Sequence, residues 1–268
     1  AHMATDENTN EHYKVVSSEY HKFWFYGKDT PYEKWQLEHV QAAFSGPDCS
    51  PLSKACRIAD VGGGTGRFAS LLRSRLGLEQ PVMCVDLSQS MLDEAQALEG
   101  VNTLCLGAVE YARVAPREEF DRVLLKEIVH LVPVPDLTEM YKGLFDTLKA
   151  GGVCVTVTRP KREIQYPFSQ QARAVWEANQ VDAAILSDAI KTAGFQVETR
   201  TETFPVTMKQ ADWLSFVENR IWSTFAETNF SNAQLQDTLT EIKQRFPADA
   251  GGNITFGEVM VFLRAIKR

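Results

Sequence analysis

The feature that most constrains the fold is a glycine-rich turn. The run D-V-G-G-G-T-G at 60–66 lies between a short apolar strand, predicted over 57–61, and a segment with apolar residues at helical spacing. Glycines allow a sharp turn and close approach of a ligand, because no Cβ stands in the way. The next helix offers free N–H groups and the positive end of its dipole. Such a turn binds ligands at the carboxyl edge of a parallel sheet.

The glycine spacing separates the candidate ligands. Gly62, Gly64 and Gly66 follow G-x-G-x-G, whereas dinucleotide folds use G-x-G-x-x-G, and no P-loop pattern occurs. Asp60 stands two positions before the first glycine, where a carboxylate would repel a phosphate. It suits an ammonium or sulfonium group, directly or through water. A plain turn without a ligand and a dinucleotide site are the less favoured interpretations.

A second carboxylate fits the same ligand. Asp86 ends a strand predicted over 81–86 and stands 20 positions after Gly66. A carboxylate at that strand end can accept hydrogen bonds from both ribose hydroxyls of a nucleoside. The glycine turn and Asp86 together therefore predict a pocket for a positively charged nucleoside.

The rest of the chain alternates strands with helices. Further strands are predicted over 101–106, 120–125 and 153–157, and Asp136 with Glu139 predicts a capping box for the helix between the last two. Beyond them the sequence predicts helices over 166–178 and 182–193, a strand over 195–206, a helical insert capped by Ser231 and Gln234, and a last strand over 254–265.

This order predicts an α/β fold. We expect a doubly wound, mostly parallel seven-stranded sheet with helices on both faces, an antiparallel last strand and a helical lid or insert. Residues 1–12 are interpreted as a tag remnant and mobile N-terminus, and 13–50 as an N-terminal helical lid. Residues 51–268 form the main domain, with helical insertions at about 160–180 and 208–250.

Charge and cysteine content narrow the functional classes. The net charge of −7 argues against a nucleic-acid partner. No apolar run is long enough for a membrane span, so we expect no membrane partner. The five cysteines form no C-x-x-C pair, and Cys84, Cys105 and Cys154 are expected to be buried thiols of a cytoplasmic protein. No metal is expected because no ligand cluster has suitable spacing. A monomer or a homodimer is expected.

These motifs resemble those of class I, Rossmann-like S-adenosylmethionine-dependent methyltransferases over most of 56–160. The resemblance rests on the glycine turn, the acidic residue ending the second strand, and three further segments. These are L-G-A-V-E at 106–110, F-D-R-V at 120–123 and L-K-A-G-G at 148–152. One position departs from the family, since Ala108 stands where an Asp often binds the adenine amine. Glu110 or backbone groups would have to replace that contact.

The resemblance implies which residues bind S-adenosyl-L-methionine, with S-adenosyl-L-homocysteine as product. The implied cofactor residues are Asp60, Gly62, Gly63, Gly64, Gly66, Asp86, Leu87, Met91, Gly107, Ala108, Val109 and Lys126. Glu127 and His130 follow the fourth strand and are the implied catalytic residues; either can act as a base or orient the acceptor, or His130 can simply pack. The implied substrate residues are Tyr20, Trp24, Tyr26, His130, Tyr166 and Arg220.

The favoured function is methyl transfer to a nitrogen, sulfur or oxygen nucleophile of a small molecule by in-line displacement. The alternatives are a protein or RNA methyltransferase, or a protein that binds S-adenosylmethionine without transferring its methyl group. A nicotinamide dehydrogenase is disfavoured by the glycine spacing. A metal-dependent O-methyltransferase is disfavoured because Glu127 is the only acidic residue of the segment after the fourth strand.

Overall fold

A computed structural model describes residues 23, 25 and 29–268. The chain divides into two compact units. The first contains 161–180, 203–259 and the described residues up to 35, and the second contains 36–160, 181–202 and 260–268.

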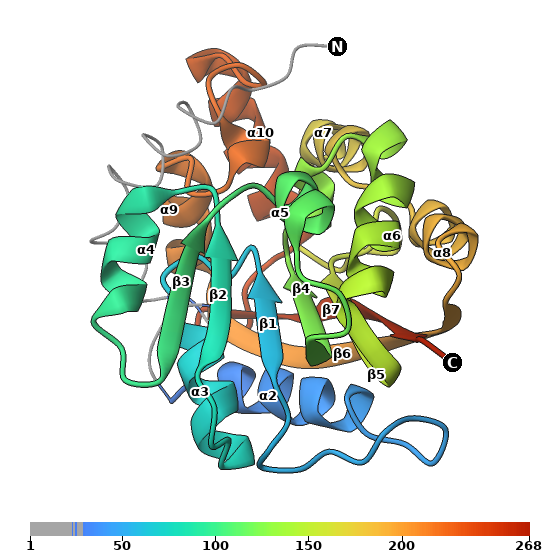
Figure 1. Ribbon diagram of the computed structural model, residues 1–268. Helices are drawn as coiled ribbons and strands as arrows, with labels where there is room; N and C mark the ends of the chain where they lie inside the picture. Colours follow the sequence, from blue (N-terminus) through green and yellow to red (C-terminus); the bar gives the residue numbers. More distant parts are fainter. Residues whose placement is uncertain (1–22, 24, 26–28) are drawn as a thin grey trace. The chain divides into compact units, whose positions relative to one another are not determined.

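Seven strands form one sheet in the order β3-β2-β1-β4-β5-β7-β6 (Figure 1). Strands β1 to β5 are parallel to their neighbours, and β7 runs antiparallel to β5. This arrangement confirms the fold class predicted from the alternation of strands and helices. The strands are β1 (Ile58–Val61), β2 (Val82–Asp86), β3 (Val101–Cys105), β4 (Phe120–Lys126), β5 (Leu148–Thr158), β6 (Gln196–Lys209) and β7 (Asn253–Ile266).

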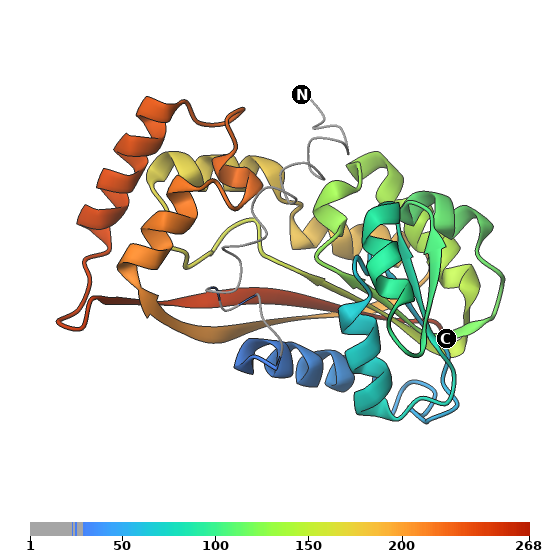
Figure 2. The same cartoon turned by 90° about the vertical axis from the view of Figure 1, so that its left-hand side faces the viewer.

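Helices cover both faces of the sheet in the second unit. Figure 2 shows α2 and α3 on the opposite face from α6 and α8. The helices containing residues of this unit are α2 (Pro31–Ala43), α3 (Arg67–Leu76), α4 (Gln89–Gln96), α5 (Ala108–Val114), α6 (Leu137–Thr147) and α8 (Ala183–Thr192), with 3-10 turns η2 (Val129–Leu131) and η3 (Val134–Asp136).

The core of the second unit forms where apolar strand residues meet α5, α6 and α8. Val123 and Leu125 of β4 alternate with polar or opposite-facing positions and pack with Met140 and Leu144 of α6 and Ile190 of α8. All five side chains are fully buried. Their burial fixes the strand register, because a slip by one residue would turn each side chain to the other face.

The first unit has an aromatic core of its own. Its helices are α7 (Gln170–Asn179), α9 (Gln210–Glu218) and α10 (Asn232–Arg245), with the 3-10 turn η4 (Ser223–Phe225). Trp213 stacks on Phe216 at a centroid distance of 5.0 Å, and its indole donates a hydrogen bond to the Pro167 carbonyl at 2.9 Å. Each large aromatic ring buries much apolar area, so a few such residues contribute strongly to the stability of a small unit.

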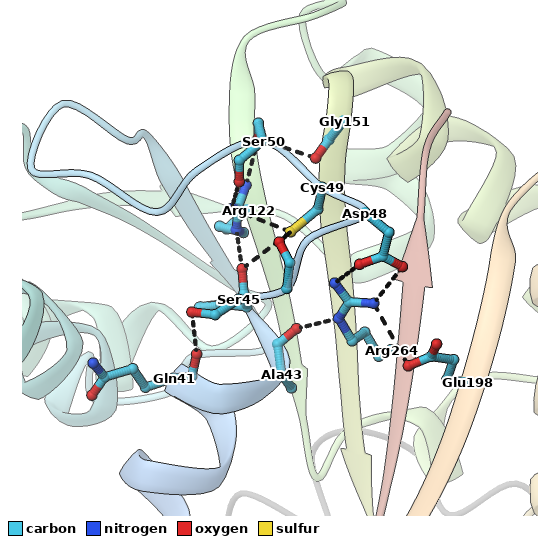
Figure 3. A network of polar contacts seen from close by, with 12 residues as sticks. Gln41, Ala43, Ser45, Asp48, Cys49, Ser50, Arg122, Gly151, Glu198 and Arg264 are labelled. Atoms are coloured by element: carbon cyan, nitrogen blue, oxygen red, sulfur yellow. Dashed lines mark hydrogen bonds and ion pairs between the residues drawn. The ribbon is translucent and has the colours of Figure 1, made fainter.

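Two buried arginines hold the loop that follows α2 (Figure 3). Arg122 of β4 is fully buried, and its guanidinium donates to the Phe44 carbonyl at 2.8 Å and to the Ser50 hydroxyl at 3.0 Å. Arg264 of β7 donates to the Ala43 carbonyl at 2.8 Å and forms a two-point ion pair with Asp48. These bonds satisfy loop carbonyls that would otherwise be buried without partners.

Of three local predictions from the sequence, two are wrong and one is confirmed. The predicted capping box at Asp136 is wrong: the Asp136 side chain makes no capping bond, and Glu139 instead pairs with Arg113 at 2.7 Å. Cys105 is exposed rather than buried, because β3 is the edge strand. The capping box of Ser231 and Gln234 is confirmed by bonds of 3.3 and 2.9 Å.

Arg122→Met is expected to destabilise the protein by about 3 kcal/mol, because it orphans buried carbonyl groups of the loop. Urea unfolding followed by circular dichroism measures the change. Arg117→Met is the control, since the Arg117 side chain is 80% exposed and its ion pair with Asp146 contributes little. Equal effects of the two substitutions would contradict the role given to Arg122.

Candidate active site

The glycine turn joins β1 to α3 and is held by the end of β2. The N–H groups of Gly62 and Gly63 both donate to the Val85 carbonyl, at 2.7 and 3.1 Å. Gly62 has φ 77°, and a Cβ there would lie 2.2 Å from Cγ2 of Ile128. Gly66 has φ 68°, and a Cβ there would lie 2.7 Å from Cβ of Ala95. The turn therefore packs against the segment after β4 and against α4 only because these positions are glycine.

Asp86 fixes the turn from the carboxyl end of β2. Its Oδ2 accepts a hydrogen bond from the Gly64 N–H at 2.9 Å, and its Oδ1 accepts one from the Ser88 N–H at 2.9 Å. These two bonds orient the carboxylate and leave each oxygen a further lone pair. Asp86 is partly exposed, so the remaining lone pairs are available to hydroxyl groups of a ligand.

Asp60 is a buried carboxyl group without a hydrogen-bond partner among the residues that the structure describes. Its side chain is 1% exposed, and neither oxygen accepts a bond from the described residues. Burial raises its pKa to about 7; the charge of Lys126 opposes that rise and the charge of Asp86 adds to it. A Cβ on Gly63 would lie 3.0 Å from Oδ2 of Asp60, so the glycine keeps space over the carboxyl group. A buried acid of this kind favours a cationic ligand.

Small and apolar groups lie beyond Asp86, at the ends of β2 and β3. Leu87 is half exposed, while Met91, Gly107, Ala108 and Val109 are partly buried. The Leu106 N–H donates to the Asp86 carbonyl at 3.1 Å, which links the two strand ends. The carboxylate of Glu110 accepts the Gly107 N–H at 3.2 Å, so it is engaged with its own helix start. This surface has few polar side chains and therefore suits a flat, aromatic ring.

Charged groups from three elements meet at the end of β4. The Glu127 carboxylate forms ion pairs with Arg159, the residue after β5, and with Lys126 at 3.0 Å, and it accepts a bond from Gln36 of α2 at 3.3 Å. Burial opposes ionisation of Glu127, but the two cations outweigh it and hold its pKa well below the usual range. Glu127 is thus a permanent anion whose charge is balanced within the site.

His130 lies three positions further along, in η2, and is partly buried. Burial and, to a smaller extent, the positive charge of Arg159 lower its pKa to about 4, and the charge of Glu127 opposes this shift. The imidazole is therefore neutral at pH 7. Beside it, Leu131 and Val134 are 65% and 49% exposed, which is unusual for large apolar side chains.

The predicted substrate residues are not brought together by the second unit. Tyr20, Trp24 and Tyr26 lie outside the described residues. Tyr166 belongs to the first unit, where it is buried and its hydroxyl donates to Glu258. Arg220 belongs to the first unit too, and it donates to the Phe225 carbonyl at 2.6 Å and to Asn232 at 3.0 Å. Their role in substrate binding stays a prediction.

Sequence reasoning missed Arg159 and Gln36. Arg159 could have been found, because a charged residue directly after a buried parallel strand lies at the ligand-binding edge of the sheet. Gln36 is 4% exposed and meets a partner 91 positions away, a pairing that no local pattern indicates. Among the described residues, no group of three or more His, Cys, Asp or Glu side chains is arranged to hold a metal. No helix in that part of the chain has the length and apolar character to cross a membrane.

Asp60→Asn is expected to raise the melting temperature of the ligand-free protein more at pH 8 than at pH 5. As pH rises from 3.8 towards 7, the unfolded chain ionises at this position while the folded state resists, so the wild type loses stability. The variant escapes this loss, and its advantage should grow by about 2 kcal/mol between the two pH values. A gain of equal size at both pH values would show that Asp60 ionises normally.

Comparisons with known proteins agree with this geometry. Residues 58–152 match the sequence model of a family described as methyltransferase domain. This range begins with β1 and contains the glycine turn, Asp86 and the charged residues at the end of β4. No curated protein matches the chain significantly.

Solved structures share the fold at low sequence identity. A SAM-dependent methyltransferase from Archaeoglobus fulgidus has a TM-score of 0.57 and 17% identity, covering 95% of this chain and 99% of its own. Phosphoethanolamine N-methyltransferase 2 from Haemonchus contortus, solved with phosphomonomethylethanolamine and S-adenosylhomocysteine, has a TM-score of 0.57 and 18% identity, covering 98% and 57%. The [4+2]-cyclase SpnF has a TM-score of 0.59 and 16% identity, covering 98% and 96%. These likenesses confirm the predicted fold.

Proposed function

We propose that this chain, whose residues 58–152 match a methyltransferase domain, is a class I, Rossmann-like, S-adenosylmethionine-dependent enzyme that methylates a small-molecule acceptor. The observation that carries the proposal is the pairing of an orphaned buried acid, Asp60, with a glycine turn held by the Asp86 carboxylate. A buried acid without a partner and a turn rich in glycine both destabilise the ligand-free fold, and a bound cationic nucleoside would offset this loss of stability.

The residues present fit the cofactor. Asp60 would hold its ammonium group, directly or through water, and Gly62 to Gly66 would accommodate the adjoining chain without a Cβ clash. Asp86 would accept the ribose hydroxyls with the lone pairs that Gly64 and Ser88 leave free. The adenine would lie against Leu87, Met91, Gly107, Ala108 and Val109, where Ala108 requires backbone groups to bind the ring nitrogens.

The cofactor contact predicted for Lys126 stays a prediction, and its surroundings indicate a further electrostatic role. Its ammonium pairs with Glu127 and lies 5.2 Å above the Phe68 ring, and its charge also acts on Asp60. Lys126 thus adjusts the charge of the pocket floor, which lets Asp60 ionise when a cation is bound. We propose that Lys126 contributes to the electrostatics of the pocket.

The apolar surface after β4 supports a small organic acceptor. Leu131 and Val134 expose large side chains beside His130, and their burial under an acceptor would contribute roughly 1 to 2 kcal/mol each. A solved structure of the same fold, phosphoethanolamine N-methyltransferase 2, is in complex with the small molecule phosphomonomethylethanolamine, which supports the proposal. The net charge of −7 speaks against RNA as acceptor.

When bound, the cofactor supplies an electrophilic methyl group on a sulfonium. The protein's task is to hold the acceptor in line with that methyl group, so much of the rate gain comes from proximity and orientation. Glu127 binds Arg159 and Gln36 at the end of β4, and His130 follows three positions later in η2. A second candidate function is catalysis of another reaction by a cofactor-bound protein, which the structural likeness to a [4+2]-cyclase favours.

The test is a screen of amines, thiols, phenols and carboxylates with S-adenosylmethionine, in which release of S-adenosylhomocysteine is measured by mass spectrometry. We expect one class of acceptor to raise this release well above the acceptor-free rate. Tight binding of S-adenosylhomocysteine in calorimetry without turnover of any acceptor would instead favour the second candidate function.

Asp86→Ala serves as the binding-deficient variant in the same experiment. It removes both backbone contacts of the turn and the proposed ribose contacts, so S-adenosylhomocysteine binding should be lost in calorimetry. Asp93→Ala is its matched control, because Asp93 lies exposed on α4 and bonds only to Gln89 among the described contacts. Wild-type affinity in Asp86→Ala would contradict the proposed cofactor site.

A further inference from the structure

We propose that β6 is the contact strand of a symmetric homodimer, in which residues 196–202 pair antiparallel with the same residues of a second copy of the chain, about a two-fold axis at Thr199. The occupant of this sheet edge is thus a second copy of the protein. The inference does not depend on the proposed function, and it selects the homodimer from the two oligomeric states that the sequence left open.

The first support is the place of β6 in the sheet. The strand order puts β6 at one end, so β7 is its only neighbouring strand in the described part of the chain. Residues 198–201 are all exposed, and Val197 and Glu202 on either side of them are partly buried. An accessible edge strand presents N–H and C=O groups that can hydrogen-bond to a strand of another molecule. The edge at 196–202 is therefore open to pairing.

The second support is the regular register between β6 and β7. The hydroxyl oxygens of Thr207 and Thr255 lie 3.1 Å apart, and the Glu198 carboxylate lies 3.6 Å from the guanidinium of Arg264, as Figure 3 shows. The step from 198 to 207 along β6 equals the step from 264 back to 255 along β7. Both pairs therefore belong to one antiparallel register, and no bulge interrupts β6 between them.

An unbroken register shows which backbone groups of β6 point away from β7. Gln210, directly after β6, donates its N–H to the Gly252 carbonyl at 3.0 Å, in the same register. Both backbone groups of a strand residue point to one side, and those of the next residue point to the other side. Even-numbered residues of β6 thus bond to β7, and odd-numbered residues point outwards. Pro205 agrees with this, because a proline lacks the N–H and is tolerated on the free side of an edge strand.

The third support is the charge pattern of the edge, which complements itself about Thr199. In that pairing Glu198 of each copy lies opposite Arg200 of the other copy, so the two-fold axis generates two ion pairs. These positions are even-numbered, so they form pairs without mutual backbone bonds, whose side chains come closest. Arg200 is exposed and has no ion-pair partner among the described residues, and only Oε2 of Glu198 is engaged by Arg264.

The backbone favours the same pairing. Val197, Thr199 and Thr201 direct their N–H and C=O groups outwards, and in this register each meets an outward-pointing residue of the second copy and can exchange both bonds with it. Pairing about Arg200 would instead bring the two arginines together, and like charges directly opposite each other are destabilising. Pairing about Thr201 would place Pro205 opposite Val197, where the proline has no N–H to donate. Thr199 is therefore the centre that charge and backbone both select.

Sedimentation equilibrium tests the proposal on the full chain. The wild type should form a dimer. Arg200→Glu should raise its dissociation constant by about a hundredfold, because two ion pairs become two pairs of like charge. Thr199→Pro should have a similar or larger effect, because it removes both central N–H donors while their side of β6 bonds to no strand of its own chain. Arg117→Glu is the control, since it makes the same change of charge at a side chain that is 80% exposed elsewhere on the protein.

Disulfide trapping tests the register. In a Cys105→Ser background, which removes the exposed native thiol, Thr199→Cys places the two new thiols directly opposite each other. The Cα atoms of such a pair lie about 5.5 Å apart, which a disulfide can span. Mild oxidation should therefore give a covalent dimer on a non-reducing gel. Thr201→Cys is the matched control, because it lies opposite Val197 of the second copy and should stay largely monomeric on the gel.

Three outcomes would overturn the proposal. The first is a wild type that sediments as a monomer at about 0.1 mM, where an affinity in the micromolar range gives mostly dimer. The second is a dimer that persists unchanged in Arg200→Glu, a surface variant whose fold is checked by circular dichroism. The third is a crosslink that forms as readily at Thr201→Cys as at Thr199→Cys. Neither experiment needs cofactor or acceptor, so their results do not depend on whether methyl transfer is found.

Discussion

The site depends on one carboxylate that binds two backbone amides. Asp86 receives the N–H groups of Gly64 and Ser88, and so joins the turn after β1 to the turn after β2. Both turns follow buried parallel strands, whose register places their carboxyl ends side by side. A charged acceptor strengthens hydrogen bonds to backbone donors, which holds a turn of four glycines in one conformation. Without that bond the glycines would carry a large entropic cost and no defined pocket.

From this point the site extends as a row of charges along the carboxyl ends of β1, β4 and β5. Asp60 is buried with no hydrogen-bond partner in the described part of the chain, Lys126 acts on it from the next strand, and Glu127 connects Lys126 to Arg159. The acid at one end of the row has a raised pKa and the acid at the other has a lowered one. Two carboxyl groups whose pKa values are shifted in opposite directions often have different roles in an active site. The orphaned acid suits a cation, and the paired acid suits a structural role.

Much of this could be predicted from the sequence because the signals are local. The glycine turn, the acid 20 positions later and the alternation of strands with helices are read within short windows, and the structure confirms the seven-stranded sheet that they predict. The predicted capping box at Asp136 is absent, since Asp136 makes no side-chain capping bond and Glu139 pairs with Arg113. Cys105 failed because an apolar run does not reveal that its strand lies at the edge of the sheet.

The remainder depends on contacts between distant segments. Gln36 and Arg159 reach Glu127 across 91 and 32 positions, and no propensity or period carries that information. Arg122 and Arg264 are similar, since each binds carbonyls of a loop far away in the sequence. Tyr166 was expected to serve a substrate; it is buried in a packed aromatic core, and its role in substrate binding stays a prediction. An aromatic pattern alone therefore does not separate a binding surface from a core.

The central claim is that the turn at 62–66 and the two carboxylates beside it hold a positively charged nucleoside. A crystal of the protein soaked with S-adenosylmethionine tests this most directly. The account predicts electron density for the nucleoside with its ribose hydroxyls on Asp86 and its ammonium group towards Asp60. An empty crevice at saturating concentration, or a pyrophosphate lying across the glycines, would contradict it.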